Sequence, residues 1–153
     1  MSKRTEGVGV VRKLLRITIG VVILIEAIAL LIGAAHHFGI SLPGPFRESR
    51  SLLTAVLEAG SGVVLLLAAS AIATRQRKAW KLAVAGHVVG VAGIAWGIVT
   101  GGPASAAQFS HHRPMLLFLI VALIALSTPV CRQALENGRQ RHRRRKRSLQ
   151  TVL

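Results

Sequence analysis

Two glutamates stand alone inside long apolar stretches, and they are the first residues whose chemistry needs an explanation. Glu26 lies in the run from Leu14 to Ala35, and Glu58 lies in the run from Ser51 to Thr74. An ionised carboxylate inside a membrane span is costly, so such acids usually face a partner, a cavity or a proton path. At about 1.5 Å per residue the two acids lie about 14 Å and 11 Å from the outer ends of their helices. We therefore expect them to share one polar pocket.

The second run carries further polar groups on the same helical face as its glutamate. Thr54, Glu58, Ser61 and Gly62 follow one another at i, i+4, i+7 and i+8, which aligns them along one side of a helix. This strip and Glu26 predict either a proton-sharing pair or the lining of a quinone or other cofactor pocket. The alternative is structural, with each acid protonated and hydrogen-bonded to a neighbouring helix.

His87 lies in a third apolar run, beside a row of glycines. Gly86, Gly90, Gly93 and Gly97 share one helical face. Small residues at this spacing let two helix backbones approach closely, so they predict a helix-packing surface. His87 flanks that face by about 100°. It is either a hydrogen-bonded packing residue or a fifth member of the candidate cofactor site formed by Glu26, Glu58, Thr54 and Ser61.

Two histidine pairs, His36-His37 and His111-His112, fall at the expected outer ends of the first and fourth runs. Histidine is a common ligand of metals and haem, so these four residues are candidate ligands at the outer mouth. Their spacing matches no zinc or copper signature. Histidines at a membrane interface also occur without any ligand role.

Composition requires that these groups be positioned by membrane helices. Hydrophobic residues make up 52 % of the 153 residues and charged residues only 16 %, yet the net charge is +15. Soluble domains have about 25 % charged residues. The basic residues lie between and beyond the apolar runs, whereas a nucleic-acid-binding domain would interleave them with its core. We therefore expect no nucleic-acid partner.

Four runs, at residues 14–35, 51–74, 82–100 and 115–130, predict an all-α fold, a four-transmembrane-helix antiparallel bundle. The 22 residues of the first run cover about 33 Å, enough to cross a hydrocarbon core of roughly 30 Å. A secretory signal peptide would have a shorter apolar stretch. The fourth run is expected to begin after Pro114, as the first helical position, and to fray near Pro129. The membrane domain spans 1–135, and 136–153 form a polybasic tail.

Lysine and arginine are distributed unequally between the two sides that these runs define. Seventeen of the twenty lie before or at the start of the first run, between the second and third runs, or after the fourth; the exceptions are Arg47, Arg50 and Arg113. The positive-inside rule therefore predicts that both termini are cytoplasmic, in a cell membrane. The tail at 139–147 is expected to bind anionic lipid headgroups.

The second run and its exit resemble the DoxX family. The residues that carry the resemblance are Leu57-Glu58-Ala59-Gly60-Ser61-Gly62, the leucines at 65–67, and Thr74-Arg75; the start of the first run, at 16–20, is also similar. The resemblance covers about half of the chain and implies a small membrane subunit linked to sulfur or thiol oxidation and quinone. Glu58, Gly60 and Gly62 match the family pattern. The single cysteine, Cys131, makes thiol–disulfide exchange by this chain itself unexpected.

Three classes of function follow. The first is a non-catalytic accessory subunit that packs into a homo-oligomer or a larger membrane complex, because the loops are too short for a substrate domain. The second is a redox protein that binds quinone or haem through intramembrane Glu and His. The third is a small transporter, which would need to oligomerise because four helices leave little room for an alternating path.

Overall fold

The computed structural model describes residues 3–40, 52–100 and 109–136, except for the side chains at 3–8 and 109–112. This part of the chain is helical throughout and contains no strand. It forms α1 (Lys3–His37), α2 (Leu52–Ala73), α3 (Ala79–Thr100), α4 (Phe109–Ser127) and α5 (Pro129–Glu136). The all-α prediction is therefore confirmed for the described residues.

Three of these helices are long and apolar enough to cross a membrane. They are Gly9–His37 within α1, Leu52–Ala73 and Ala79–Thr100. A fourth candidate span is the pair Arg113–Ser127 and Pro129–Glu136, whose two parts are bent by 74° relative to each other. The described residues thus provide three spans, or four if the bent pair crosses as one.

The outer surface of the helices is unlike that of a water-soluble protein. Glu26, Glu58 and His87 are at most 3 % exposed, whereas Val21, Ile25 and many other large apolar side chains are more than half exposed. Soluble proteins seldom expose apolar patches of this extent. This distribution indicates helices whose outer surfaces contact lipid.

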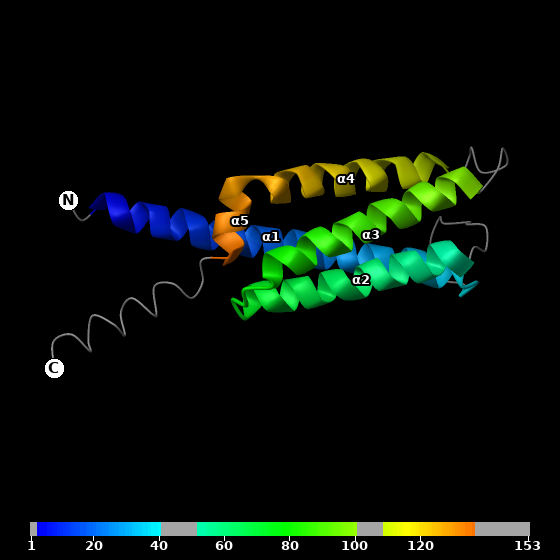
Figure 1. The fold of residues 1–153 in the computed structure, drawn as a ribbon, viewed down its shortest axis with the longest axis horizontal. Coiled ribbons are helices and arrows are strands. Elements are labelled where there is room, and N and C mark those ends of the chain that lie inside the picture. The colour runs from blue at the N-terminus through cyan, green and yellow to red at the C-terminus, as the bar shows by residue number, and fades with distance from the viewer. Residues whose placement is uncertain (1–2, 41–51, 101–108, 137–153) are drawn as a thin grey trace.

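The helices run back and forth along the long axis of the molecule, and the N-terminal part of α1 extends beyond its neighbours (Figure 1). α2 packs against both α1 and α3, and α4 packs against α3. The short α5 contacts α1 and α3 at the end where α2 turns into α3 (Figure 1). The best-buried large apolar residues, Ile23, Leu30, Leu65, Ile94 and Leu119, come from all four long helices.

The predicted glycine face of α3 lies in its contact with α2. Cβ atoms at Gly86 and Gly93 would lie 2.5 Å from the side chain of Leu65 and 2.9 Å from that of Leu57. A Cβ at Gly97 would lie 3.1 Å from the Thr54 side chain. Such distances are too short for a real side chain, so these glycines allow α2 and α3 to approach each other closely.

The connection between α2 and α3 is tight and ends α2 with a capping motif. The Gln76 amide donates to the Ala71 carbonyl at 2.8 Å, and the Arg75 amide donates to the Ile72 carbonyl at 3.2 Å. This is the Schellman arrangement, in which one residue takes the left-handed conformation. Here that residue is Arg75, with a φ of 58°, where glycine is the usual choice.

Several helix boundaries differ from those expected. α1 and α3 begin earlier, at Lys3 and Ala79, than the expected 14 and 82. α4 begins at Phe109, so Pro114 lies inside the helix and is not its first residue. Proline at this position removes one intrahelical hydrogen bond, and its ring crowds the carbonyl four residues earlier.

The expected single helix over 115–130 is wrong at its end, because the chain bends sharply at Thr128. Pro129 has no N–H and would clash with the helix carbonyl four residues earlier. The Thr128 hydroxyl donates to the Ala125 carbonyl at 2.7 Å, and the Trp80 indole donates to the Leu126 carbonyl at 2.9 Å. Protein groups therefore donate to the carbonyls freed by the break, and α5 starts as a separate helix.

Candidate functional site

The most deeply buried polar contact joins α1 to α3. Glu26 Oε2 lies 3.0 Å from His87 Nε2, and neither side chain is more than 2 % exposed. The other ring nitrogen, His87 Nδ1, lies 2.7 Å from the Ala83 carbonyl oxygen. A carbonyl can only accept, so Nδ1 carries a proton and Nε2 faces the carboxyl group.

At 3.0 Å the two atoms are close enough to share one proton between Oε2 and Nε2. Either a protonated Glu26 donates to a neutral imidazole, or an imidazolium donates to the carboxylate. The two states interconvert without a change in the net charge of the pair, which keeps the electrostatic cost inside the bundle low. The second carboxyl oxygen, Glu26 Oε1, is also buried and has no hydrogen-bond partner among the described residues.

A second carboxyl–imidazole contact joins α2 to the C-terminal end of α1. Glu58 Oε2 lies 3.7 Å from His37 Nε2, with side chains 3 % and 5 % exposed. The Glu58 carboxyl rests against α1 at Gly33, where a Cβ would lie only 2.9 Å from Oε2. Glycine at 33 therefore makes the space that this carboxyl group occupies.

The polar strip of α2 faces the inside of the bundle as expected, with Thr54, Glu58 and Ser61 all buried. The Ser61 hydroxyl donates to the Gly86 carbonyl at 2.7 Å, next to His87 in the chain. A Cβ at Gly90 would lie 2.8 Å from Ser61 Oγ. Ser61 thus lies along the α2–α3 contact between the level of Glu58 and that of His87.

The pairing differs from the shared Glu26–Glu58 pocket that depth alone predicted. Glu26 of α1 pairs with His87 of α3, and Glu58 of α2 pairs with His37 of α1. Gly33, where Glu58 rests, is seven residues from Glu26, which corresponds to about 10 Å along α1. The candidate site is therefore two carboxyl–imidazole pairs at two levels of the bundle.

The role of His37 as a partner of Glu58 was missed by sequence reasoning, although a signal was present. His37 follows Glu26 by eleven residues and Gly33 by four, close to whole numbers of helical turns. These three residues consequently lie on the face of α1 that looks into the bundle. The same periodicity places His37 on that face and its neighbour His36 about 100° away from it.

The four histidines predicted as metal ligands are not assembled into a metal site by the described residues. His37 faces Glu58, and the side chains of His111 and His112 lie outside the described part. Across the residues that the structure does describe, no group of three or more His, Cys, Asp or Glu side chains is arranged to hold a metal ion.

Comparison with protein-family models, with characterised proteins and with solved structures gives no match to this chain. The function is therefore inferred from the chemistry of the buried pairs and from the helices that hold them.

Proposed function

We propose that this chain is a small multi-pass membrane subunit of a larger membrane complex, and that its Glu26–His87 pair exchanges protons during that complex's quinone-linked redox reaction. In this proposal four antiparallel spans cross a cell membrane, with α4 and α5 together as the fourth and both termini cytoplasmic. The observation that carries the proposal is the 3.0 Å contact between Oε2 of Glu26 and Nε2 of His87 in a membrane-type core.

The surroundings of the pair support a proton-exchanging role over simple packing. Hydrogen bonds between membrane helices contribute only about 1–2 kcal/mol, and hydroxyl or amide side chains provide them without a titratable group. Here two titratable groups face each other, and a second pair, Glu58–His37, lies nearer the outer end. Ionisable residues inside a membrane commonly mark proton relays.

The subunit role rests on the short connection between α2 and α3. The α2–α3 connection consists of residues 74–78, which leaves no room there for a substrate domain. The large exposed apolar surface of α1 and α4 suits lipid or the helices of partner proteins. The resemblance to DoxX-like subunits agrees with this proposal, and it remains a prediction.

The test is gentle detergent extraction of the tagged full-length chain, followed by mass spectrometry of the proteins and quinones that co-purify. We expect membrane redox proteins in fixed stoichiometry. Vesicles containing that complex should lose redox-coupled proton uptake when Glu26→Gln is introduced, while the complex stays assembled. A chain that purifies without partners would overturn the subunit role, and unchanged proton uptake in the variant would overturn the role of the pair.

A second candidate is that the chain itself binds a quinone. The buried Oε1 of Glu26, with no partner among the described residues, supports it, because a protonated carboxyl group can donate to a quinone carbonyl oxygen. Haem ligation by His87 is less favoured, since Ala83 and Glu26 face its two ring nitrogens. Quinone retained by the purified chain alone, and lost in Glu26→Leu, would favour this candidate.

A further inference from the structure

The turn between α2 and α3 borders an open cavity that the redox proposal does not use. Its volume is about 590 Å³, and it is lined by Thr74, Arg75, Gln76, Arg77 and Lys78. Typical small-molecule sites have volumes of about 300–1,000 Å³. The cavity is thus large enough for a polyatomic group.

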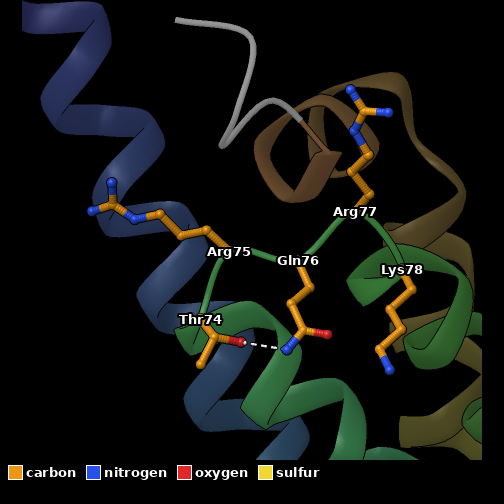
Figure 2. A pocket seen from close by; sticks show the side chains of 5 residues that line it. All are labelled: Thr74, Arg75, Gln76, Arg77 and Lys78. Carbon is orange, nitrogen blue, oxygen red and sulfur yellow. Dashed lines mark hydrogen bonds between the residues drawn. The ribbon is translucent and has the colours of Figure 1, made fainter. Parts of the chain in front are cut away.

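The charge around this cavity is strongly unbalanced. Three of its five lining residues are cationic, and Arg16 of α1 lies close enough to Arg75 to repel it electrostatically. Figure 2 shows Arg75 extending toward α1, whereas Arg77 points to the other side of the turn. The described acidic residue at this end, Glu136, is already paired with Arg132 at 3.2 Å. Described protein groups therefore leave the cavity's positive charge uncompensated.

The backbone at Arg75 adds an independent observation. Arg75 takes the left-handed conformation, with a φ of 58°, which glycine adopts with less strain. Its side chain lines the cavity. Strained residues that persist in a fold often have a functional reason, and here the guanidinium group, which glycine lacks, provides one.

A hydrogen bond within the turn and a ring contact next to it stabilise the residues that line the cavity. The Thr74 hydroxyl accepts a hydrogen bond from the Gln76 side-chain amide at 3.0 Å (Figure 2). Two residues beyond Lys78, the Trp80 ring lies 4.7 Å from the Arg132 guanidinium carbon of α5. The cavity therefore lies at the end of the helices, between α1 and α5, where lipid headgroups meet a membrane protein.

We propose that this cavity binds the phosphate group of an anionic lipid headgroup, attracted by the positive charge of Arg75, Arg77 and Lys78. Arginine and lysine are the side chains best suited to phosphate, and basic pockets between helices at the cytoplasmic side bind such headgroups.

Trp80 provides a direct readout, because the chain has only two tryptophans. The Trp96→Phe variant of the full chain, in neutral detergent, is titrated with short-chain phosphatidylglycerol, and its fluorescence is followed. Short-chain phosphatidylcholine and inorganic phosphate are titrated separately. We expect saturable binding of phosphatidylglycerol, at least tenfold weaker binding of phosphatidylcholine, and no response to inorganic phosphate at the same concentrations.

Two sets of substitutions then locate the site. Arg77→Gln with Lys78→Gln should weaken phosphatidylglycerol binding by about thirtyfold, since each basic residue near anionic lipid contributes about one kcal/mol. Arg12→Gln with Lys13→Gln removes the same charge from α1 and should change binding by less than threefold. Arg75→Gly should weaken binding while raising the thermal midpoint in neutral detergent, because it relieves the strained conformation.

Equal losses of phosphatidylglycerol affinity in the two double variants would overturn the assignment of the site to this cavity, since they would show a general charge effect. Equal binding of phosphatidylcholine would overturn the requirement for an anionic headgroup. A full response to inorganic phosphate would overturn the lipid source and assign the cavity to a soluble phosphate compound. A stable Arg75→Gly variant with unchanged binding would show that Arg75 does not attract the headgroup.

Discussion

At the scale of single residues, the Glu26–His87 contact makes a quantitative prediction. Replacing either residue with leucine leaves its partner buried without its hydrogen bond, so we expect each single variant to lose about 2 kcal/mol of unfolding free energy. The double variant removes both polar groups and should cost at least 1 kcal/mol less than the sum of the two. The measurement is SDS-induced unfolding followed by circular dichroism. Additive losses would show that the two side chains do not interact.

Gly33 makes the corresponding prediction for the second pair. In Gly33→Ala the new Cβ would lie 2.9 Å from Glu58 Oε2, so the carboxyl group must shift relative to His37. Overpacking of this kind costs about 1–3 kcal/mol, against a gain in helix propensity of up to about 1 kcal/mol. In the control Gly9→Ala nothing lies within 4 Å of the new Cβ, so only the propensity gain applies. Gly33→Ala should therefore have a lower thermal unfolding midpoint in detergent than Gly9→Ala, and equal midpoints would contradict the model of the pair.

The sequence identified which residues are buried and polar, but it did not identify their partners. Glu26, Glu58, Thr54, Ser61 and His87 are recognisable because each interrupts an apolar run. Depth along a helix follows from counting residues, but rotation and crossing angle decide which side chains meet, and they depend on packing. That is why two acids of similar depth pair with histidines of different helices.

At the scale of helices, the glycine face of α3 makes a prediction with a matched control on α2. A side chain at Gly90 would press against Ser61 Oγ and Leu119, so Gly90→Leu should destabilise the bundle by about 3 kcal/mol or more, because it forces backbones apart. Gly60 has nothing within 4 Å of an added Cβ, so Gly60→Leu should be neutral or slightly stabilising. SDS resistance on gels compares the two variants. Equal resistance would indicate that the glycine face is not a tight contact.

The bend between α4 and α5 depends on Trp80. In Trp80→Phe the aromatic ring remains, but the Leu126 carbonyl loses its indole donor. We expect a loss of about 1 kcal/mol and faster amide hydrogen exchange at residues 126–136. Faster exchange spread evenly over the molecule would show that the bond does not specifically support the bend.

Helix existence followed from the sequence, whereas several helix ends did not. The apolar runs locate α2 almost to the residue, because polar residues and a tight turn follow it. The ends of α1 and α3 extend into polar sequence, since a helix continues past the apolar region when its capping groups lie farther on. The proline predicted a frayed helix end near 129, but not a second helix at an angle of 74°. Trp80, which lies far away in sequence, contacts both sides of this bend.

At the scale of the whole molecule, the open question is whether α4 and α5 together cross the membrane. The basic residues predict that they do, because the tail after them is strongly basic and its side should match that of residues 75–81. If the bent pair instead returned to the side from which α4 entered, residues 106 and 150 would share a side. The charge pattern and the bend therefore make different predictions that one experiment can separate.

That experiment uses single cysteines in a Cys131→Ser background, at Pro45→Cys, Lys78→Cys, Ala106→Cys and Gln150→Cys. With both termini cytoplasmic, a membrane-impermeant maleimide should label positions 45 and 106 in intact cells and positions 78 and 150 only after permeabilisation. Labelling of position 150 in intact cells together with 106, while 78 stays protected, would show three crossings with α4 and α5 on the outer side. In that case the 74° bend would mark a re-entrant segment. The basic tail would then be an exception to the positive-inside rule.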